Sequence, residues 1–410
     1  MARRVVVTGA GGITAFGEDW DTIKERFLQG KNAVKYMQEW EYFKGLNTKL
    51  AVPIENFELP AHYTRKKIRS MGRVSLLATR ATEKALENAG LLDNEVITNG
   101  QTGIAFGSCF GSTQPVVAYA KMLDGGDTSR ISGTTYVQLM PHTTAVNAGL
   151  FFGVTGRVIP TSSACTSGSQ AIGYAYEAIK FGMQDLMIAG GAEELCPSMA
   201  ASFDTLFATS TLNEKPEETP KPFDKNRDGL VVGEGSGALI LEELEHAKNR
   251  GANILAEVVG FASNCDATHI TQPKKETIQI CIANALKNAQ LKAEDIGYIS
   301  AHGTSTSRGD IAESLATEAI FGSETPISSI KSYLGHTLGA CGALEAWFAI
   351  QMMNEGWFAH TANLKEPDEN CGKLDYIMNE PRRLNTDYIM SNNFAFGGVN
   401  TSLIFKRFYA

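Results

Sequence analysis

Cys165 lies where an apolar, β-prone run from Arg157 to Ala164 meets an amphipathic stretch that begins at Thr166. This pattern predicts a strand that ends near the cysteine and a helix that begins just after it. Because free amides and the positive end of a helix dipole stabilise anions, we expect the pKa of the Cys165 thiol to be lowered. Such a thiol would be a ready nucleophile.

Cys109 is a weaker candidate for the nucleophile. The segment from Gly107 to Gly111 has the shape of a nucleophile elbow with cysteine in place of serine. No helical pattern follows it directly, because Pro115 intervenes, and we therefore favour Cys165. The seven cysteines are scattered and lack any Cys-x-x-Cys pairing, so we expect neither a disulfide framework nor a metal site.

Two histidines, His302 and His336, are each flanked by a glycine and placed in loops after apolar runs. Open α/β sheets place their sites at strand ends, so both histidines are candidates for one site. A cysteine with two histidines and no acidic triad member suits thioester chemistry: the thiolate accepts an acyl group, and neutral imidazoles donate hydrogen bonds to an enolate oxygen. The same groups would also suit a cysteine hydrolase. The hydroxyls of Thr304 and Thr306 could line the mouth of a binding tunnel for an extended polar ligand.

The elements that must position these groups recur in two similar halves, residues 1–253 with the nucleophile and residues 254–410 with both histidines. Continuous apolar runs favour strands that are covered on both faces, with helices between them. They predict strands at 5–9, 102–107, 157–160, 185–191, 238–242, 254–260, 296–300 and 327–331, and two more after Tyr388. Helical patterns cover 75–89, 171–181, 242–250, 277–289 and 340–353, and another follows Asp310, whose carboxylate we expect to cap it by accepting from Ile311 onward. The chain is thus predicted to be an α/β protein.

Composition limits the partners and the location. The chain has 410 residues, 43% of them hydrophobic, and a formal net charge of −8, which favours a folded protein and disfavours nucleic acid or an anionic membrane as a partner. No apolar segment is long enough to span a membrane, and the run Val5–Val7 is too short for a signal peptide, so we expect a cytoplasmic location.

One basic segment stands out on this acidic chain. No acidic residue occurs between Glu58 and Glu83, whereas six cations do: Arg65, Lys66, Lys67, Arg69, Arg73 and Arg80. These residues predict either a solvated helix face or a dock for an anionic partner.

Two patterns point to other classes of protein and are rejected. Gly9–Gly12 after a strand, together with Tyr176 and Lys180, suggests a short-chain dehydrogenase, but Thr14 stands where the third glycine of the dinucleotide loop belongs. The segment Asp224–Gly229 imitates the start of a calcium loop, but Gly235 occupies the position of the bidentate glutamate.

Six motifs along the chain resemble, in order, those of the elongating, type II β-ketoacyl-acyl carrier protein synthases. They are Ser163-Ala-Cys165-Thr-Ser-Gly168, Ala189-Gly-Gly-Ala-Glu193, Pro222-Phe-Asp-Lys-Asn-Arg-Asp-Gly229, His302-Gly-Thr-Ser-Thr306, Lys331-Ser-Tyr-Leu-Gly-His336 and Asn393-Phe-Ala-Phe-Gly-Gly-Val-Asn400. The match covers essentially the whole chain.

The resemblance implies a thiolase-like fold with two α/β halves related by a pseudo-dyad, whose mixed sheets sandwich helices in a layered αβαβα arrangement. It also implies that Cys165 accepts an acyl chain from carrier protein. His302 and His336 would bind the malonyl thioester carbonyl and promote decarboxylation, and Lys331 and Glu345 would form a polar network behind them. The product would be a β-ketoacyl thioester with two more carbons.

The same resemblance assigns the binding residues. The amides of Cys165 and Phe396 would form the oxyanion hole, with the Phe396 ring as the gate of the acyl pocket, and Phe110 and Phe394 would line that pocket. Thr304 and Thr306 would hold the 4′-phosphopantetheine arm that arrives on the carrier protein, and no other cofactor is expected. The acidic carrier protein would dock on Arg65, Lys66, Lys67, Arg69 and Arg73. A homodimer is expected, or a heterodimer with a ketosynthase-like partner.

The chain departs from the family pattern at three places. Ser307 and Arg308 replace the usual residues before Gly309, and Val399 replaces a threonine. Phe110 is bulkier than the usual glycine or isoleucine, which predicts a preference for short, flat or unsaturated acyl chains, as in the ketosynthases of aryl-polyene pathways. The alternatives are a non-catalytic chain-length factor, although Cys165 is present, and a thiolase, although its late Cys-x-Gly is missing.

Overall fold

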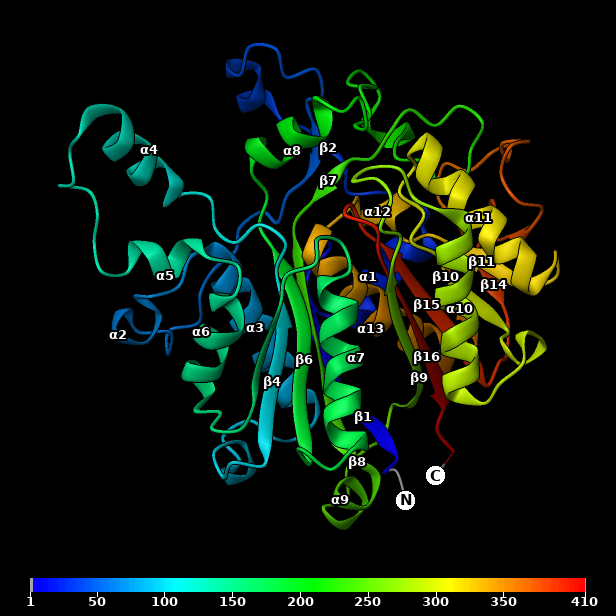
Figure 1. Cartoon of the computed structure of the whole chain (residues 1–410), viewed down its shortest axis with the longest axis horizontal. Helices are drawn as coiled ribbons and strands as arrows, with labels where there is room; N and C mark the ends of the chain where they lie inside the picture. The colour runs from blue at the N-terminus through cyan, green and yellow to red at the C-terminus, as the bar shows by residue number, and fades with distance from the viewer. Residues whose placement is uncertain (1–2, 410) are drawn as a thin grey trace.

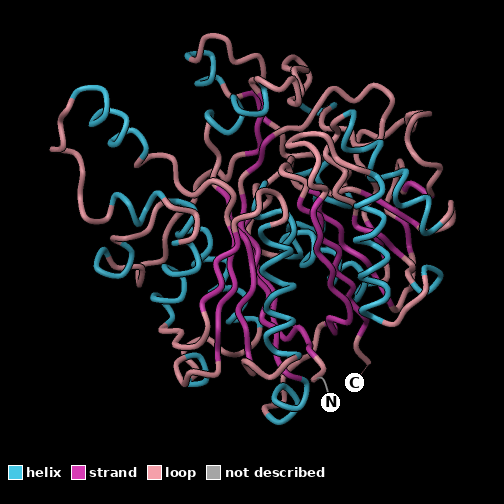
Figure 2. Tube along the Cα trace, in the orientation of Figure 1, coloured by secondary structure: helices cyan, strands magenta, loops and turns pink. Residues whose placement is uncertain are grey.

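The structure is a computed structural model that describes residues 3–409, and its centre is a twisted 11-stranded sheet (Figures 1 and 2). Its strands follow the order β13-β11-β10-β15-β16-β9-β1-β8-β6-β4-β5. Their bounds are β1 Val5–Ile13, β4 Thr102–Gly107, β5 Val158–Thr161, β6 Leu186–Glu193, β8 Gly235–Glu243, β9 Ala256–Cys265, β10 Tyr298–Ser300, β11 Pro326–Ser328, β13 Asp375–Tyr376, β15 Tyr388–Phe394 and β16 Val399–Arg407. Two small sheets flank it, formed by β2 Lys35–Tyr36, β3 Leu50–Val52 and β7 Val232–Gly233, and by β12 Trp357–Phe358 and β14 Arg382–Arg383.

Apart from β13, which pairs with β11 at one edge, the large sheet consists of two equivalent halves. The first half has the order β1-β8-β6-β4-β5 and the second has β9-β16-β15-β10-β11. In each half, neighbouring strands among the first three are antiparallel. The third, fourth and fifth strands run parallel to one another. The predicted pseudo-dyad is therefore confirmed. A short ladder in which Val5–Val7 of β1 pairs with 256–258 of β9 joins the two halves into one sheet.

Helices form three layers around the two half-sheets. In the middle, α7 (Ser167–Lys180) packs against α13 (Cys341–Glu355), and both contact strands of both halves. On the outside, α3 (Arg73–Asn88) and α6 (Thr143–Phe152) cover the first half, and α10 (Lys275–Ala289) and α11 (Ser307–Phe321) belong to the second half, where α10 packs on β9 and β16 (Figure 1). The predicted αβαβα layering is confirmed. The remaining helices are α1 Trp20–Leu28, α2 Arg65–Ile68, α4 Val116–Gly125, α5 Thr135–Leu139, α8 Pro197–Asp204, α9 Leu244–Asn249 and α12 Lys331–Leu334.

The glycines that imitate a dinucleotide loop lie inside strand β1. A Cβ at Gly9 would come within 2.4 Å of the Ala85 carbonyl oxygen, and one at Gly11 within 2.7 Å of the Lys84 side chain, both on α3. These glycines therefore let α3 pack closely on β1. Tyr176 is buried within α7 and its hydroxyl contacts Lys180, which agrees with the interpretation of both as ordinary helix residues.

Two local expectations meet different outcomes. Asp224 closes a turn by accepting from the amides of Asn226, Lys365 and Glu366, as a structural turn should. The prediction that Asp310 caps a helix is wrong, because α11 already begins at Ser307. The buried Asp310 carboxylate reaches back instead and accepts from the amides of Thr304, Ser305 and Phe223.

Within residues 3–409, no helix combines the length and the apolarity that crossing a membrane requires.

Candidate active site

Cys165 lies on the turn between β5 and α7, as predicted. Thr166 is the N-cap of α7, and Ala164 has a positive φ of 52°, a conformation that L-residues seldom adopt. A sharp strand-to-helix turn of this kind presents the side chain at its tip to a cavity while the backbone stays in the core. The Cys165 side chain is nevertheless well covered, with the residue only 4% exposed.

The structure brings both predicted histidines to this thiol. His336 Nε2 lies 3.0 Å from Cys165 Sγ, and the ring centroids of His302 and His336 are 5.2 Å apart. The sulfur of Cys165 and one ring nitrogen of each histidine lie within 4.8 Å of one another, and all three residues are buried. Residues from the two halves thus converge on one point.

The surroundings of each imidazole fix its orientation. The Leu338 amide donates to His336 Nδ1 at 3.2 Å. Around His302 Nδ1 lie two donors, Lys331 Nζ at 3.2 Å and Asn393 Nδ2 at 3.4 Å. A neutral imidazole that accepts at Nδ1 carries its proton on Nε2, so both rings present an N–H to the cavity.

This arrangement fits an oxyanion better than a metal ion. A histidine that ligates a metal through Nε2 usually donates its Nδ1–H to a carboxylate or a carbonyl. Here donors surround Nδ1 of both His302 and His336, and each Nε2 keeps its proton. The expectation of a site without metal stays a prediction, and the hydrogen-bond pattern supports it.

Burial dominates the electrostatics of the three groups. Burial, with a further contribution from the nearby Lys331 ammonium, holds the pKa of His302 and of His336 well below the usual value of 6.5, so both imidazoles are neutral at pH 7. Burial also raises the pKa of the Cys165 thiol to about 11, although Lys331 and the amides of Phe396 and Cys165 act in the opposite direction. The predicted lowering of this pKa is therefore wrong, because loss of hydration outweighs the helix terminus.

We expect the rate of iodoacetamide modification at Cys165 to rise about tenfold per pH unit between about pH 7 and pH 9, because only the thiolate reacts and its fraction grows tenfold per unit below the pKa. The measurement is the alkylated fraction of the peptide that contains residue 165, compared at each pH with the peptide of the exposed Cys265. A plateau below pH 8 would instead show that the helix terminus controls this thiol.

A buried ion pair supports the histidines from behind. Lys331 Nζ donates to Glu345 Oε1, and both side chains are 2% exposed. Asn393 Nδ2 donates to Glu345 Oε2 at 2.7 Å and thereby closes a ring of contacts with His302. Burial acts to lower the pKa of Lys331, but Cys341 and Glu345 raise it by more, so the ammonium stays charged. The predicted network of Lys331 and Glu345 thus lies directly behind His302.

Lys331→Ala is expected to lower the free energy of unfolding by about 3–5 kcal/mol, because it leaves the Glu345 carboxylate buried without its partner. The double variant Lys331→Met/Glu345→Gln should recover most of this loss. The free energy is measured by urea unfolding, with Lys292→Ala as the control, since Lys292 and Glu294 form an exposed pair with side chains 79% and 75% exposed. Equal losses of unfolding free energy in Lys331→Ala and Lys292→Ala would contradict the view that Lys331 and Glu345 form a buried ion pair.

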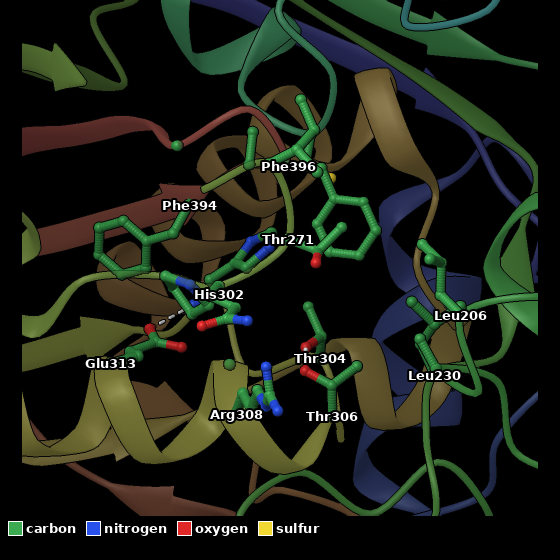
Figure 3. Close-up of a pocket in the computed structure, with 18 of the residues that line it drawn as sticks. Leu206, Leu230, Thr271, His302, Thr304, Thr306, Arg308, Glu313, Phe394 and Phe396 are labelled. Carbon is green, nitrogen blue, oxygen red and sulfur yellow. Dashed lines mark hydrogen bonds between the residues drawn. The ribbon is translucent and has the colours of Figure 1, made fainter. Parts of the chain in front are cut away.

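The three residues open into a cavity of about 360 Å³ (Figure 3). Thr304, Thr306 and Phe394, which were predicted to bind substrate, line it, and so does Phe396, the predicted gate. Their roles stay predictions. The hydroxyls of Thr304 and Thr306 lie 2.8 Å apart, and the Phe396 ring packs against Phe203 with centroids 5.3 Å apart. The cavity is therefore polar along the strand-end loop and aromatic opposite it.

Two predicted residues do not line this cavity. Phe110 is 40% exposed and its amide donates to Glu193 Oε1 at 3.1 Å, so within this chain its ring does not narrow the space beside Cys165. Cys109 also lies outside the cavity lining, and its amide donates to Glu193 Oε2 at 2.7 Å. This placement favours Cys165 over Cys109 as the nucleophile.

Three functional positions carried no assigned role in the sequence interpretation. Buried Glu313 accepts from the amides of His302 and Gly303 at 2.7 Å each and shapes their loop. Glu193 ties the loop at 108–110 to the amide of Gly339, and Asn393 joins Glu345 to His302. Glu193 and Asn393 stand in motifs noted above, whereas the signal for Glu313 is only its spacing of about one helical turn after Asp310.

The basic segment divides into two parts in the structure. Four of its cations are exposed, with no carboxylate of residues 3–409 at ion-pair distance: Arg65, Lys66, Lys67 and Arg69. They lie on and beside the short helix α2. Arg73 instead pairs with Glu234 through two guanidinium nitrogens, and Arg80 pairs with Glu18 and Glu83. Arg73 therefore serves an internal contact while its side chain stays 38% exposed, and its place in the predicted docking set stays a prediction.

Family models match both halves of the chain. The model described as "Beta-ketoacyl synthase, N-terminal domain" matches residues 2–247, and "Beta-ketoacyl synthase, C-terminal domain" matches residues 255–365. The chain belongs to the β-ketoacyl synthase family. The resemblance seen in the sequence motifs is thereby confirmed, while the boundary between residues 253 and 254 stays a prediction.

Named relatives and solved structures agree. The "3-oxoacyl-[acyl-carrier-protein] synthase 2" of Vibrio cholerae is 35% identical over 99% of each chain. The crystal structure of a β-ketoacyl synthase from Burkholderia phymatum is 57% identical, covers 99% of this chain and 100% of its own, and superposes with a TM-score of 0.98. A type II polyketide ketosynthase solved in complex with its acyl-carrier protein and bound to the hexaketide is 30% identical, with 100% of both chains covered and a TM-score of 0.88.

Proposed function

We propose that the protein is a β-ketoacyl-acyl carrier protein synthase that extends an acyl chain by two carbons through decarboxylative condensation. In the first step Cys165 Sγ attacks an acyl thioester, and the carrier-protein thiol leaves. In the second, a malonyl thioester loses CO₂, and its electron pair forms the enolate. The enolate carbon then attacks the acyl-Cys165 carbonyl, expels the cysteine thiolate and yields the β-ketoacyl thioester.

One observation carries this proposal: two neutral imidazoles present Nε2–H groups to the space beside one thiol. Decarboxylation places negative charge on the thioester oxygen, and paired donors in a site shielded from water stabilise that charge. Hydrolysis of the acyl-cysteine would need a base that activates water, whereas Nε2 of both His302 and His336 already carries a proton. The geometry therefore favours condensation over hydrolysis.

Acyl transfer to Cys165 needs stabilisation of a second oxyanion. The amides of Phe396 and of Cys165 both act on Sγ by lowering its pKa. A carbonyl carbon bonded to Sγ would hold its oxygen close to the same amides, as an oxyanion hole requires. We assign these two amides to the acyl oxyanion, and Thr304 and Thr306 to the pantetheine amides of the arriving arm.

The alternatives lack support at their key residues. A chain-length factor lacks the nucleophile, which is present here at the meeting point of the two halves. A thiolase needs a second catalytic cysteine, and among residues 3–409 no other cysteine lines the cavity.

The experiment that tests the proposal is a condensation assay. The protein is incubated with an acyl-carrier protein and malonyl-carrier protein, and the products are detected by mass spectrometry. A β-ketoacyl-carrier protein two carbons longer than the starter, formed with CO₂, supports the function. Release of free acid without a longer product would favour a hydrolase.

We further propose that the acidic carrier protein docks on Arg65, Lys66, Lys67 and Arg69. The double variant Lys66→Glu/Arg69→Glu is expected to raise the KM for carrier-protein substrates about tenfold, because reversed charge repels an acidic partner, with an effect that salt weakens. The KM for pantetheine thioesters should not change. Arg383→Glu, an exposed change on β14, is the control, and an unchanged KM for carrier protein in the double variant would contradict this surface.

A homodimer is part of the proposal. Strand β5 forms one edge of the large sheet, and exposed apolar side chains gather on β5 and on the helices next to it in sequence, α4 to α6. They include Val116 (42%), Val117 (52%), Tyr136 (50%), Leu150 (73%) and Val158 (43%). An open strand edge beside such residues favours pairing with a second copy. Sedimentation at twice the chain mass would support this assembly.

We propose that Phe110 helps to determine which acyl chain the protein accepts, because it shapes the acyl pocket in the assembled dimer. Phe110→Gly should then broaden the range of accepted chain lengths in the condensation assay.

Because the chain's cysteines are free in the structure, we also propose a reducing compartment such as the cytoplasm.

A further inference from the structure

The cavity wall that begins at His302 leads outward to a cation. His302 is 6% exposed, Thr304 is 8% exposed, and Arg308 is exposed, and all three line the same cavity. Figure 3 draws Arg308 beside Thr304 and Thr306, with His302 further along the wall. A substrate that reaches the histidines along this wall therefore passes Arg308.

Arg308 has a charge that the protein does not neutralise. Among residues 3–409 no carboxylate lies within ion-pair distance of its guanidinium. The two nearest acidic residues in sequence, Asp310 and Glu313, are buried and accept from the backbone amides of the strand-end loop. A guanidinium at the mouth of a cavity without an internal partner is suited to bind an anion of the ligand.

The turn that carries Arg308 is held in place by buried contacts. Behind it, Arg227 donates to the carbonyl of Ser307 at 3.0 Å, and its own charge is balanced by Asp310 and Asp368. Thr306 is the N-cap of the 15-residue helix α11, and its side chain makes no capping hydrogen bond, so the first helix amides remain available beside Arg308.

The order of the residues along the wall indicates which anion reaches Arg308. The thioester of a phosphopantetheine arm has to reach the buried His302, so the rest of the arm extends toward the exposed end of the wall, where Arg308 lies. The phosphodiester is the anion at that end of the arm. The malonyl carboxylate, by contrast, must lie at the buried end of the cavity.

We propose that Arg308 binds the phosphodiester of the carrier protein's phosphopantetheine arm and so positions the thioester at the histidines. This inference rests on the proposed function. The planar guanidinium donates two parallel hydrogen bonds to the phosphate oxygens, which an ammonium cannot reproduce. Arg308 is thus a binding residue that recognises the arm independently of the surface on which the carrier protein docks.

The test compares two small acyl donors that differ only in the phosphate: acyl-pantetheine and acyl-4′-phosphopantetheine. The rate constant for acylation of Cys165 is measured by intact mass spectrometry. The wild-type protein should react about tenfold faster with the phosphorylated donor, Arg308→Ala should lose this preference, and Arg308→Lys should keep part of it. Rates with acyl-pantetheine should be equal in all three proteins, and Arg383→Ala should behave as wild type.

Two outcomes would overturn the inference, and they can be told apart. If Arg308→Ala slows both donors equally, or neither, then Arg308 does not bind the phosphate, although acylation of Cys165 still supports the proposed function. If no donor, including acyl-carrier protein, acylates Cys165 in the wild-type protein, then the proposed function fails and this inference fails with it.

Discussion

Replacement of Cys165 by alanine is expected to lower the rate of condensation by at least about 10³-fold, because no other group can hold the acyl chain as a covalent intermediate. Decarboxylation of malonyl-carrier protein should persist in this variant, since it depends on the histidines. Product formation and CO₂ release are measured in parallel with the same substrates. The variant should therefore separate the two half-reactions.

Cys109→Ala provides the matched control for this variant. Cys109 follows strand β4 as Cys165 follows strand β5, but it lies outside the cavity lining. It should retain condensation at close to the wild-type rate. If Cys109→Ala abolished condensation while Cys165→Ala retained it, the assignment of the nucleophile would be wrong.

His302→Ala and His336→Ala are each expected to lower the rate of malonyl decarboxylation by about 10²–10³-fold, because each removes one hydrogen-bond donor to the developing enolate oxygen. CO₂ release is best measured in the Cys165→Ala background, where condensation does not compete. His142→Gln, a change at an exposed residue, is the control.

The pH dependence of this step follows from the lowered pKa of both histidines. The neutral imidazoles act as donors, and protonation begins only well below the usual value of 6.5. We therefore expect the decarboxylation rate in the Cys165→Ala background to stay level between pH 8 and about pH 6.5. A sigmoidal loss centred near pH 6.5 would indicate solvated histidines and contradict the buried site.

The sequence predicts the framework of the site well because its signals are local. The continuous apolar run at 102–107 coincides with β4, and the junction after Ala164 is the turn between β5 and α7. His302 follows strand β10 as predicted, whereas the strand predicted at 327–331 ends at Ser328 and helix α12 separates it from His336. Both histidines nevertheless reach Cys165 as expected. Periodicity and glycine positions are properties of short segments, so they can be read without the fold.

The parts that could not be predicted depend on contacts between distant segments. Arg73 meets Glu234, 161 positions along the chain, so part of its charge serves an internal contact. The pKa of the Cys165 thiol is raised because elements from both halves bury it, and this burial outweighs the lowering effect of the local helix terminus. Asn393 acquires its role only because β15 lies beside α13, where Glu345 is found. Such contacts have no signature in the sequence near the residues that make them.

The exposure of Phe110 has a similar origin. In the single chain Phe110 is 40% exposed, so its proposed effect on chain length depends on the proposed dimer.

Whether Cys165 carries the acyl chain can be observed on the protein itself. The protein is incubated with an acyl-carrier protein, digested, and the acyl mass is located by peptide mass spectrometry. We expect a single acylated peptide, modified at Cys165, which returns to its unmodified mass when malonyl-carrier protein is added. Acylation at another residue, or no acylation with any chain length, would contradict it.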